Sequence, residues 1–360
     1  MKPRLVRTRA GNSGEVRILL VGFGFMGKMH AAVYRQLKGV SLAGVVDPRI
    51  QETKKHLRSM QMGAPVFRDL ESVKSVPCHA VDICLPTDLH APAVAWAAGH
   101  GKHIFCEKPI ALNLAQAEKM IQQVKRAGVH FQVGHCIRFW PEYQALEKFI
   151  ASGRGGRLLS LSLQRRAGRP HYSQQDWLNG SRRSGGAALD LHIHDTDFVH
   201  HLLGQPRSVQ SIGTRDRTGW SHIFTQYEYP SVAVTAEGGW NYPTGWGFQM
   251  AFQAVFARGA MEYDSRANPS LSVVLGKAGR KAWTFATPRG GRASGAGGNL
   301  SSLGGYFNEL ASFVQSLRTG RRPEVATGPQ AAKSLATVLA EIKSARTGRR
   351  VRIPSGAFLE

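Results

Sequence analysis

Two hydrophobic patterns follow one another along the chain, and the change between them falls near residue 134. Up to that point, short apolar runs alternate with segments whose apolar residues recur at helical spacing. Such runs are typical of buried parallel strands, so the alternation predicts an α/β Rossmann domain, a doubly wound parallel sheet, over residues 15–134. The strands are predicted at 17–21, 41–46, 65–67, 80–85, 102–106 and 129–133, and the helices after residue 27 and at 51–60, 91–99 and 114–127.

Beyond residue 134, the strand-like segments come in a run with few helices between them. They lie at 158–163, 208–212, 223–229, 232–236 and 248–256, and helices are predicted at 141–152, 186–203, 306–317 and 331–345. This pattern predicts an α+β domain over residues 135–360, with a largely antiparallel open sheet covered by helices on one face. The glycine-rich segment 290–298 is expected to be a flexible loop, and the basic residues 1–14 a disordered tail.

The first predicted strand leads into a glycine-rich turn with the spacing of a dinucleotide-binding fingerprint. Gly22-x-Gly24-x-x-Gly27 stands between that strand and the first predicted helix. In such a turn Gly22 allows a tight bend, Gly24 lets a pyrophosphate approach the backbone, and Gly27 permits close helix–strand packing. The phosphates then meet the unpaired N–H groups of the helix N-terminus. A glycine turn in another α/β domain is the alternative, and the flanking strand and helix favour the dinucleotide site.

An acidic residue closes the second predicted strand. Asp47 follows Gly27 by twenty residues, which is the position from which a carboxylate binds the adenosine ribose hydroxyls. Because the same carboxylate repels a 2′-phosphate, the sequence predicts NAD as the cofactor. Arg49 lies two residues further on and weakens this preference, so NADP stays possible.

Two polar stretches carry residues that suit catalysis. Glu107-Lys108-Pro109 follows the fifth predicted strand at the ligand-binding edge, although a lysine at a strand end is more often a solvated rim residue. In the second domain, Asp190 and His194 are one helical turn apart on one face. A carboxylate contact orients an imidazole and raises its basicity, which suits proton transfer. The alternative is a buried helix whose polar stripe, continued by Asp197 and His201, is satisfied internally.

Metal ligation is a third interpretation of the second stretch, because His192 and His194 are both possible ligands. On a helix the two imidazoles point to different sides, so no metal site is predicted. The cysteines lack the C-x-x-C spacing of zinc sites and are expected to be free thiols of a cytoplasmic protein. They are Cys78, Cys84, Cys106 and Cys136.

The chain of 360 residues carries a formal net charge of +23. A basic chain attracts anions, nucleic acid included. The arginines are nevertheless spread along the sequence without a basic helix or a nucleic-acid motif, so a solvated basic surface explains the charge, and nucleic acid is not an expected partner. No apolar run is long enough for a membrane span, and no membrane partner is expected.

Taken together, the motifs resemble those of the glucose–fructose oxidoreductase, inositol dehydrogenase and MocA-like (Gfo/Idh/MocA) family over nearly the whole chain. The resemblance rests on the glycine fingerprint with His30, Pro86-Thr87 with His90, Cys106 to Pro109, Arg138-Phe139 with Pro141, Gly185-Gly186 through Asp190, His194 and Asp197, and Ser344 to Gly348. It implies a nicotinamide dinucleotide domain and an α+β domain whose open sheet often serves oligomerisation. It also implies hydride transfer on a small-molecule sugar or polyol, in a homo-oligomer (dimer or tetramer).

Residue by residue, the resemblance implies a catalytic trio. Lys108 matches the catalytic lysine and stabilises the reacting oxygen, His194 takes the hydroxyl proton, and Asp190 orients the substrate and His194. Arg138 falls where family members contact cofactor or substrate. The residues expected at the cofactor are Gly22, Phe23, Gly24, Phe25, Met26, Gly27, Asp47, Pro48, Arg49, Leu85, Pro86, Thr87, His90, Glu107, Lys108 and Arg138. Two departures from the family pattern, Ala187 and the additional His192, leave the substrate class open.

The loop between the strand near residue 163 and Gly185 bears on the substrate. Its arginines suit a carboxylate or phosphate, which guanidinium groups bind bidentately. The alternative, which the many arginines elsewhere in the chain favour, is that they belong to the same solvated basic surface. Tyr172 and Trp177 suit a neutral sugar equally well. Trp177 is expected at the substrate together with Lys108, Arg138, Asp190 and His194. The arginines are Arg165, Arg166, Arg169, Arg182 and Arg183.

Three functions are compatible with these residues. The leading hypothesis is an NAD(P)-dependent sugar or polyol dehydrogenase or reductase. The second is a glycoside hydrolase or lyase of the same fold that keeps NAD tightly bound and oxidises its sugar transiently before elimination. The third is a binding protein that has kept the fold without activity, and the presence of Lys108, Asp190 and His194 argues against it.

Overall fold

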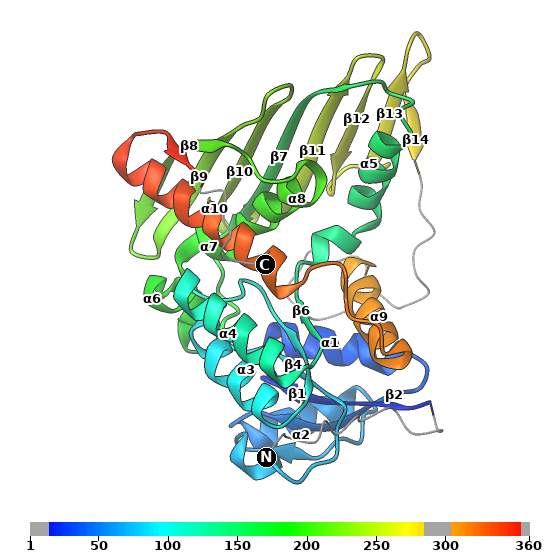
Figure 1. The fold of residues 1–360 in the computed structure, drawn as a ribbon, viewed down its shortest axis with the longest axis vertical. Helices are drawn as coiled ribbons and strands as arrows, with labels where there is room; N and C mark the ends of the chain where they lie inside the picture. Colours follow the sequence, from blue (N-terminus) through cyan, green and yellow to red (C-terminus); the bar gives the residue numbers. More distant parts are fainter. Residues whose placement is uncertain (1–13, 284–303, 354–360) are drawn as a thin grey trace.

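The computed structural model describes residues 14–283 and 304–353. Figure 1 shows two sheets, one at each end of the molecule, with helices between them. The predicted tail before residue 14 and the predicted loop at 290–298 lie outside the described residues. None of the helices in the described part of the chain combines the length and the apolar character needed to cross a membrane.

The first sheet has six strands, all parallel, as the alternating pattern predicts. Its order is β3-β2-β1-β4-β5-β6, and the direction of winding reverses between β1 and β4, where dinucleotides bind in this type of sheet. The strands are β1 (Val16–Val21), β2 (Val40–Val46), β3 (Val66–Phe67), β4 (Ala80–Ile83), β5 (His103–Cys106) and β6 (Phe131–Val133). The predicted Rossmann fold is therefore confirmed.

Helices cover both faces of the first sheet because successive residues of β1 point to opposite sides. Val16 and Ile18 pack with α1 (Phe25–Gln36) and α9 (Gly304–Thr319). Leu19 and Val21 pack on the other side, in a core with α3 (His90–Gly99), α4 (Leu114–Ala127) and α10 (Gly328–Thr347). The remaining helices of this half are α2 (Ile50–Ser59), η1 (Glu71–Val73) and η2 (Thr87–Leu89). α9 belongs to the predicted second domain, 135–360, yet it packs on the first sheet. The domain boundary predicted between residues 134 and 135 therefore stays a prediction.

The second sheet has nine strands in the order β14-β13-β12-β11-β7-β10-β9-β8-β15. All of its neighbouring strands are antiparallel except β7 and β10, so the prediction of a largely antiparallel sheet is confirmed. The strands are β7 (Leu158–Gly168), β8 (Ser208–Asp216), β9 (Gly219–Glu228), β10 (Ala233–Tyr242), β11 (Phe248–Phe256), β12 (Gly259–Asp264), β13 (Leu271–Leu275), β14 (Lys281–Trp283) and β15 (Val351–Arg352). The sequence analysis missed the four strands β12 to β15.

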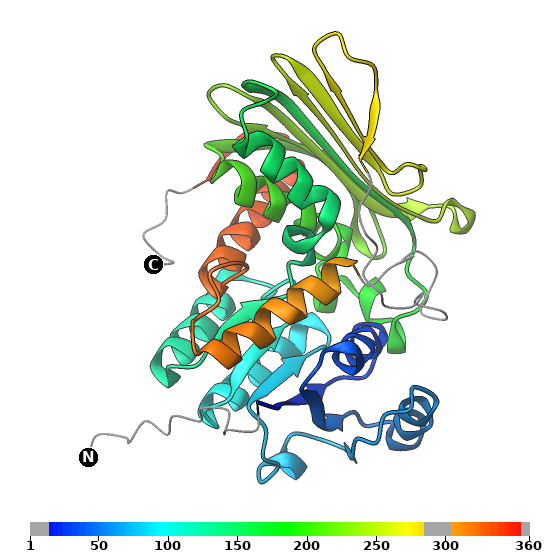
Figure 2. The same ribbon diagram turned by 90° about the vertical axis from the view of Figure 1, so that its right-hand side faces the viewer.

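Helices pack on one face of this sheet, and Figure 2 shows no described helix across the other. The covering helices are α5 (Pro141–Ala151), α8 (Ile193–Leu203) and α10. Their shared core is aromatic: Tyr143 of α5 lies edge-on to Phe198 of α8 and to Phe252 of β11. Because α10 also packs against α4 and β6, it joins the two halves of the molecule.

The prediction of one continuous helix over 186–203 is wrong. The segment forms α7 (Gly186–Asp190) and α8, which begins at Ile193, and the short α6 (Ser181–Ser184) precedes both. At the break, the N–H groups of Leu191 and His192 both bond to the carbonyl oxygen of Ala187, at 2.9 Å each. The His192 imidazole is held by Glu341 of α10, with Nε2 2.9 Å from Oε2 and both side chains fully buried. The contact joins segments that are distant in sequence, so the local pattern around His192 does not indicate it.

Candidate active site

A cavity of about 570 Å³ lies where the carboxyl ends of the first sheet's strands face the second half of the chain. Most of the residues expected at the cofactor line it: Gly22, Phe23, Gly24, Phe25, Met26, Asp47, Pro48, Arg49, Leu85, Pro86, Glu107 and Lys108. From the second half, Trp177, Asp190 and His194 also line it. The structure therefore brings the glycine fingerprint and the predicted catalytic trio into one cavity.

The glycine turn has the shape that a pyrophosphate requires. Gly22 has a φ of +91°, and a Cβ atom there would lie 2.5 Å from the carbonyl oxygen of Cys84. A Cβ atom on Gly27 would lie 2.1 Å from the carbonyl oxygen of Gly22, so Gly27 serves close packing. Gly24 instead faces open space, with nothing within 4 Å of such an atom. Because α1 begins at Phe25 without a side-chain cap, its first N–H groups are available to phosphate oxygens.

Asp47 lies at the end of β2 with both carboxylate oxygens already in use. Oδ2 accepts hydrogen bonds from the N–H of Phe23 and from Nη2 of Arg49, both at 2.8 Å. Oδ1 accepts bonds from the N–H and the Nε of Arg49, both at 2.9 Å. The guanidinium of Arg49 thus occupies the position from which ribose hydroxyls would reach the carboxylate, and it must turn away for Asp47 to bind them.

We expect the protein to bind NADH at least about tenfold more tightly than NADPH, a difference of about 1.4 kcal/mol. The carboxylate of Asp47 accepts the ribose hydroxyls and repels a 2′-phosphate, whereas Arg49 attracts that phosphate. Arg49→Ala should therefore widen the preference for NADH, and Asp47→Ala should narrow it. Fluorescence titration of each variant with both cofactors measures the effect, with Arg126→Ala, in the last turn of α4 and outside the cavity wall, as a control. Tighter binding of NADPH by the unmodified protein contradicts the assignment.

Glu107, which precedes the predicted catalytic lysine, is fixed by a buried histidine. His30 of α1 lies between two carboxylates, with Nδ1 2.8 Å from Oδ2 of Asp82 and Nε2 3.1 Å from Oε1 of Glu107. Burial opposes a charge on His30, but Asp82 outweighs it and raises the pKa of the imidazole well above its usual value. Burial likewise opposes ionisation of Glu107, yet the charge of His30 lowers its pKa. A charged imidazole therefore anchors the strand end that presents Lys108.

His90 and Thr87, expected at the cofactor, do not line the cavity. His90 is buried and bridges two carbonyl oxygens, with Nδ1 2.9 Å from that of Pro109 and Nε2 2.9 Å from that of Leu85. It thereby ties the turn after Lys108 to the end of β4, where Thr87 is also buried. The predicted contact of these two side chains with the cofactor stays a prediction without support from their placement.

Lys108 and Asp190 form an ion pair across the cavity. The ammonium of Lys108 donates to Oδ1 of Asp190 at 3.0 Å and to the backbone carbonyl oxygen of the same residue at 2.7 Å. Both side chains keep a small exposure, 13% for Lys108 and 12% for Asp190. An ammonium has three donors, so one N–H of Lys108 remains for a ligand in the cavity.

His194 lies in the first turn of α8, four residues after Asp190, and is buried, with 8% of its surface exposed. Its Nδ1 has no hydrogen-bond partner among the described residues. Burial, together with the positive charges of Lys108 and Arg165, lowers the pKa of this imidazole well below 6.5. The prediction that a carboxylate contact raises its basicity is therefore wrong, because Asp190 is engaged by Lys108 instead. His194 is neutral at pH 7, which is the form that accepts a proton.

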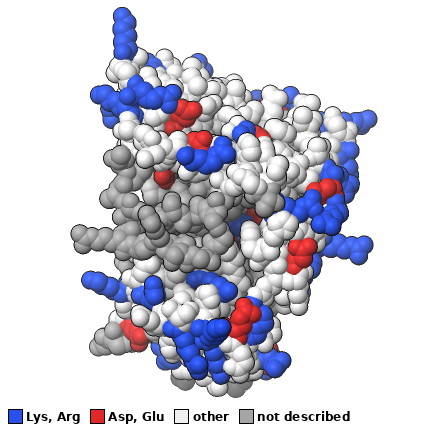
Figure 3. Space-filling model, turned by 180° about the vertical axis from the view of Figure 1, so that it is seen from behind, with Lys and Arg blue, Asp and Glu red and all other residues white. Residues whose placement is uncertain are grey.

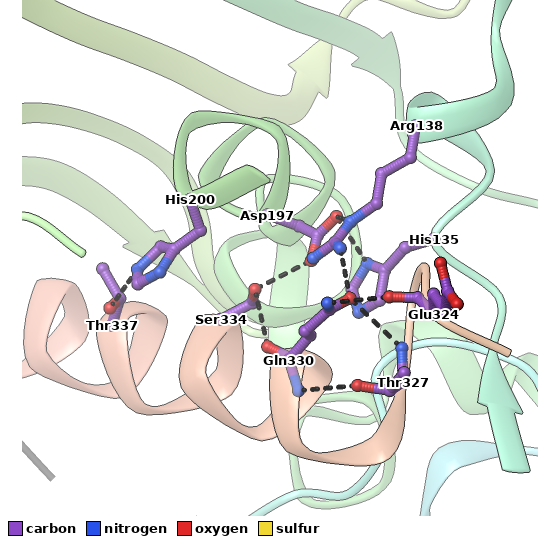
Figure 4. Close-up of polar contacts among 9 residues, drawn as sticks. All are labelled: His135, Arg138, Asp197, His200, Glu324, Thr327, Gln330, Ser334 and Thr337. Carbon is purple, nitrogen blue, oxygen red and sulfur yellow. Dashed lines mark hydrogen bonds and ion pairs between the residues drawn. The ribbon is translucent and has the colours of Figure 1, made fainter. Parts of the chain in front are cut away.

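Arg138 does not line the cavity, so its predicted contact with cofactor or substrate stays a prediction that its placement does not support. Figure 4 shows its guanidinium turned toward α8 and α10. It binds Asp197 bidentately, with Nε 2.8 Å from Oδ2 and Nη2 2.7 Å from Oδ1, and its Nη1 donates to Oε1 of Gln330 at 2.6 Å. Ser334 also donates to Asp197, at 2.8 Å. Arg138 therefore joins the segment after β6 to α8, which carries His194, and to α10.

The sequence analysis missed several apolar side chains of the cavity wall. Trp140, Phe248, Met250 and Tyr306 line it, from three segments that lie far apart in the chain. An aromatic contact also joins the two halves of the wall, where the ring of Tyr172 lies 5.0 Å from that of Phe25 in the glycine turn. Single aromatic residues at strand and helix ends are common in any core, so they gave no signal before the fold was known.

These features define a two-domain protein whose first domain is built to hold a dinucleotide beside a lysine, an aspartate and a neutral histidine. An oxidoreductase family model with an NAD-binding Rossmann fold matches residues 16–135, and the GFO/IDH/MocA C-terminal domain model matches residues 143–262. The chain belongs to the Gfo/Idh/MocA family of oxidoreductases.

Two curated relatives represent the similarity in sequence. The chain is 33% identical over 236 residues to the 2,7-anhydro-N-acetylneuraminate hydratase of Escherichia coli (strain K12), covering 62% of each protein. It is 33% identical over 198 residues to the inositol 2-dehydrogenase of Rhizobium meliloti (strain 1021), covering 54% of this chain and 57% of that protein. The chain thus spans only about three-fifths of the length of these curated relatives.

The fold is also that of solved structures. A levoglucosan dehydrogenase in complex with NADH and levoglucosan superposes with a TM-score of 0.80 at 21% identity, over 95% of this chain and 100% of that protein. An oxidoreductase from Agrobacterium radiobacter in complex with NAD+, L-tartaric acid and magnesium also gives a TM-score of 0.80, at 20% identity over 94% and 98% of the two chains. At these identities the likeness concerns the fold.

Proposed function

We propose that the protein is an NAD-dependent dehydrogenase or reductase that transfers a hydride between nicotinamide and a hydroxyl-bearing or keto carbon of a sugar, polyol or sugar derivative. One observation carries the proposal: the Lys108–Asp190 ion pair and the neutral His194 line the same cavity as the open glycine turn. The relative named inositol 2-dehydrogenase supports a polyol substrate.

In this proposal the bound nicotinamide supplies the hydride acceptor, and the chain supplies the rest. The free donor of Lys108 binds the reacting oxygen and stabilises the negative charge that develops on it. His194, whose pKa is lowered by burial and by Lys108, accepts the hydroxyl proton. Asp190 holds the ammonium in place through two of its three donors. The glycine turn and the first turn of α1 hold the pyrophosphate.

The test is the formation of NADH from NAD in the presence of a panel of sugars and polyols. The proposal expects saturable NADH formation with at least one of them, followed by absorbance at the nicotinamide band. The Asp190→Asn variant, which keeps the size of the side chain but loses its charge, should be slower with the same substrate. Absence of NADH formation and of NAD-dependent sugar turnover contradicts the proposal.

A second candidate function is supported by the relative named 2,7-anhydro-N-acetylneuraminate hydratase. In this candidate function, the cofactor stays bound, the sugar is oxidised and then reduced within one turnover, and no net oxidation results. The two candidates differ in stoichiometry: a dehydrogenase forms one NADH per product, whereas the second function gives product without NADH accumulation. Product analysis after dialysis against cofactor-free buffer distinguishes them.

Replacement of His194 by alanine should lower kcat about 10²-fold and leave the affinity for NADH nearly unchanged. The pH dependence adds a second check. Because the pKa of His194 is lowered, the imidazole stays neutral as the pH falls through 6.5, so the oxidation rate should show no loss from this group until well below that value. A rate that halves near pH 6.5 in the unmodified enzyme but not in His194→Ala contradicts this assignment.

We further propose a cytoplasmic homo-oligomer that pairs through the second sheet. The four cysteines are unpaired, which suits a reducing compartment. Strands of the second sheet expose large apolar side chains, with exposures of 68% for Ile212, 45% for Phe224 and 43% for Val255. Light scattering of Ile212→Glu and Phe224→Glu should report a smaller particle than the unmodified protein. An unchanged mass contradicts this interface.

A further inference from the structure

We infer that the substrate is uncharged in the part that the second half of the chain encloses and that it presents an apolar face to the cavity wall. This inference rests on the proposed function and narrows its substrate class. Two independent features carry it: the pairing of every described cation in the cavity wall, and the apolar, largely aromatic side chains that the second half of the chain contributes to that wall.

The charges in the described cavity wall are balanced locally, unlike those of the chain as a whole. The formal net charge of the chain is +23, and Lys and Arg side chains project from both ends of the face in Figure 3. The cations of the wall each bond to a carboxylate: Arg49 to Asp47, Lys108 to Asp190, Arg165 to Asp195, and Arg183 to Asp88. The basic excess therefore lies outside this site.

The loop arginines that suggested an anionic substrate are engaged in the same way. Arg165 is 1% exposed and binds Asp195 bidentately at 2.8 and 3.0 Å. Arg166 binds Glu237 with Nε 2.9 Å from Oε1, and Arg169 binds Asp216 at 2.5 Å. Neither Arg166 nor Arg169 lines the cavity, and neither does Arg182. The sequence hypothesis of an arginine-lined anion site thus finds no unpaired guanidinium among the described residues of the wall.

Arg183 is the most exposed of the four cations in the described cavity wall. Its Nε donates to Oδ2 of Asp88 at 2.9 Å, and its side chain is 35% exposed. The pair joins α6 to η2, so it links the two halves of the molecule beside the cavity. An anionic substrate would have to share this guanidinium with Asp88 while the pyrophosphate of a dinucleotide adds negative charge to the same cavity.

The wall contributed by the second half of the chain is mainly apolar. Its apolar members are Ile137, Trp140, Tyr172, Trp177, Leu178, Leu191, Phe248, Met250 and Tyr306, and its neutral polar members are Ser173, Gln174 and Gln175. Aromatic faces bind the C–H faces of sugars and apolar substituents, and a few polar groups then fix the orientation. An unpaired carboxylate moved from water into such a wall loses its solvation without a compensating partner.

The experiment measures binding of three ligands to the enzyme saturated with NADH, by calorimetry. Phenyl β-D-glucoside and phenyl β-D-glucuronide differ at C6, where a carboxylate replaces a neutral hydroxymethyl group. Phenyl β-D-glucoside and D-glucose differ at C1, where the phenyl group is absent from glucose. We expect the glucoside to bind at least about tenfold more tightly than each of the other two, about 1.4 kcal/mol in either comparison. Because no oxidation occurs, the result does not depend on the proposed reaction.

Variants locate the two features. Trp177→Ala should reduce the advantage of phenyl glucoside over glucose about fivefold or more, and Trp177→Phe should retain most of it. Arg183→Gln should change binding of glucoside and glucuronide by the same factor, and so should its exposed neighbour Arg182→Gln, the matched control. A role for Arg183 in reading a carboxylate would instead weaken the glucuronide selectively.

Equal or tighter binding of the glucuronide overturns the inference, and so does failure of all three ligands to bind. Selective loss of glucuronide binding in Arg183→Gln also overturns it. Absence of NADH formation from NAD with every sugar in the panel counts against the proposed function instead. A preference for the glucoside in the binding experiment would then still assign a neutral, apolar-faced ligand to this cavity.

Discussion

Replacement of Lys108 by alanine is expected to lower kcat about 10²- to 10³-fold while changing the affinity for NADH little. Lys108 lines the cavity, and the third donor of its ammonium is the only one not already used by Asp190. Without the ammonium, the negative charge that develops on the reacting oxygen has no donor from Lys108. It is also repelled by the carboxylate of Asp190, which has lost its ion-pair partner. Steady-state kinetics with the best sugar of the panel, together with NADH titration, measure both quantities.

A second lysine of the same strand region provides the control. Lys102 lies at the opposite end of β5, where its ammonium donates to the carbonyl oxygen of Cys78, and it does not line the cavity. Lys102→Ala should leave kcat within about twofold of the unmodified enzyme. Lys108→Arg should recover only part of the activity, because a planar guanidinium cannot reproduce the tetrahedral donors of an ammonium. Near-normal turnover of Lys108→Ala would show that another group stabilises the reacting oxygen.

The fold was predictable wherever the local pattern agrees with the final packing. The apolar run of β1 continues into the glycine turn and then α1, and α4 was predicted with the bounds it has, Leu114–Ala127, because both of its ends carry a local signal. Asn113 caps the first turn by accepting from the N–H of Gln116, and Gly128 ends the helix with a φ of 69°. Such signals depend only on neighbours in sequence.

The site was predictable only as far as the strand ends and the glycine turn. Asp47 and Lys108 end parallel strands, so the topology alone puts them at one edge. The lowered pKa of His194 was not predictable, because it depends on burial and then on Lys108 and Arg165, which approach from other elements. The partner of His192 at the break before α8 was not predictable either, because Glu341 lies about 150 residues further along the chain.

Arg138 illustrates the same limit, since a position in a motif does not say which way a side chain turns. The family resemblance implies a place for it at the cofactor or substrate. In the structure its guanidinium is 2% exposed and the carboxylate of Asp197 is fully buried. Burial opposes ionisation of Asp197, but Arg138 outweighs it and lowers the pKa of this carboxyl far below its usual value. The pair is therefore charged throughout the physiological range.

Removal of Arg138 is consequently expected to lower the free energy of unfolding by about 3–5 kcal/mol, because a buried carboxylate loses its bidentate partner. The paired variant Arg138→Met with Asp197→Leu should cost less than the two single changes combined, since it leaves no unpaired charge. Urea denaturation of each variant measures the loss, with Arg280→Ala, from the exposed pair Arg280–Glu262, as a control that should cost no more than about 1 kcal/mol.

The pKa of His135 provides a readout that a simple packing defect would not change. Burial lowers it to about 4 and Arg138 adds to that lowering, whereas Asp197 opposes it. In Arg138→Ala the imidazole should therefore titrate at a higher pH, with Asp197 3.4 Å away as its remaining partner. A loss of stability without that shift would mean that Arg138 acts through packing rather than through its charge.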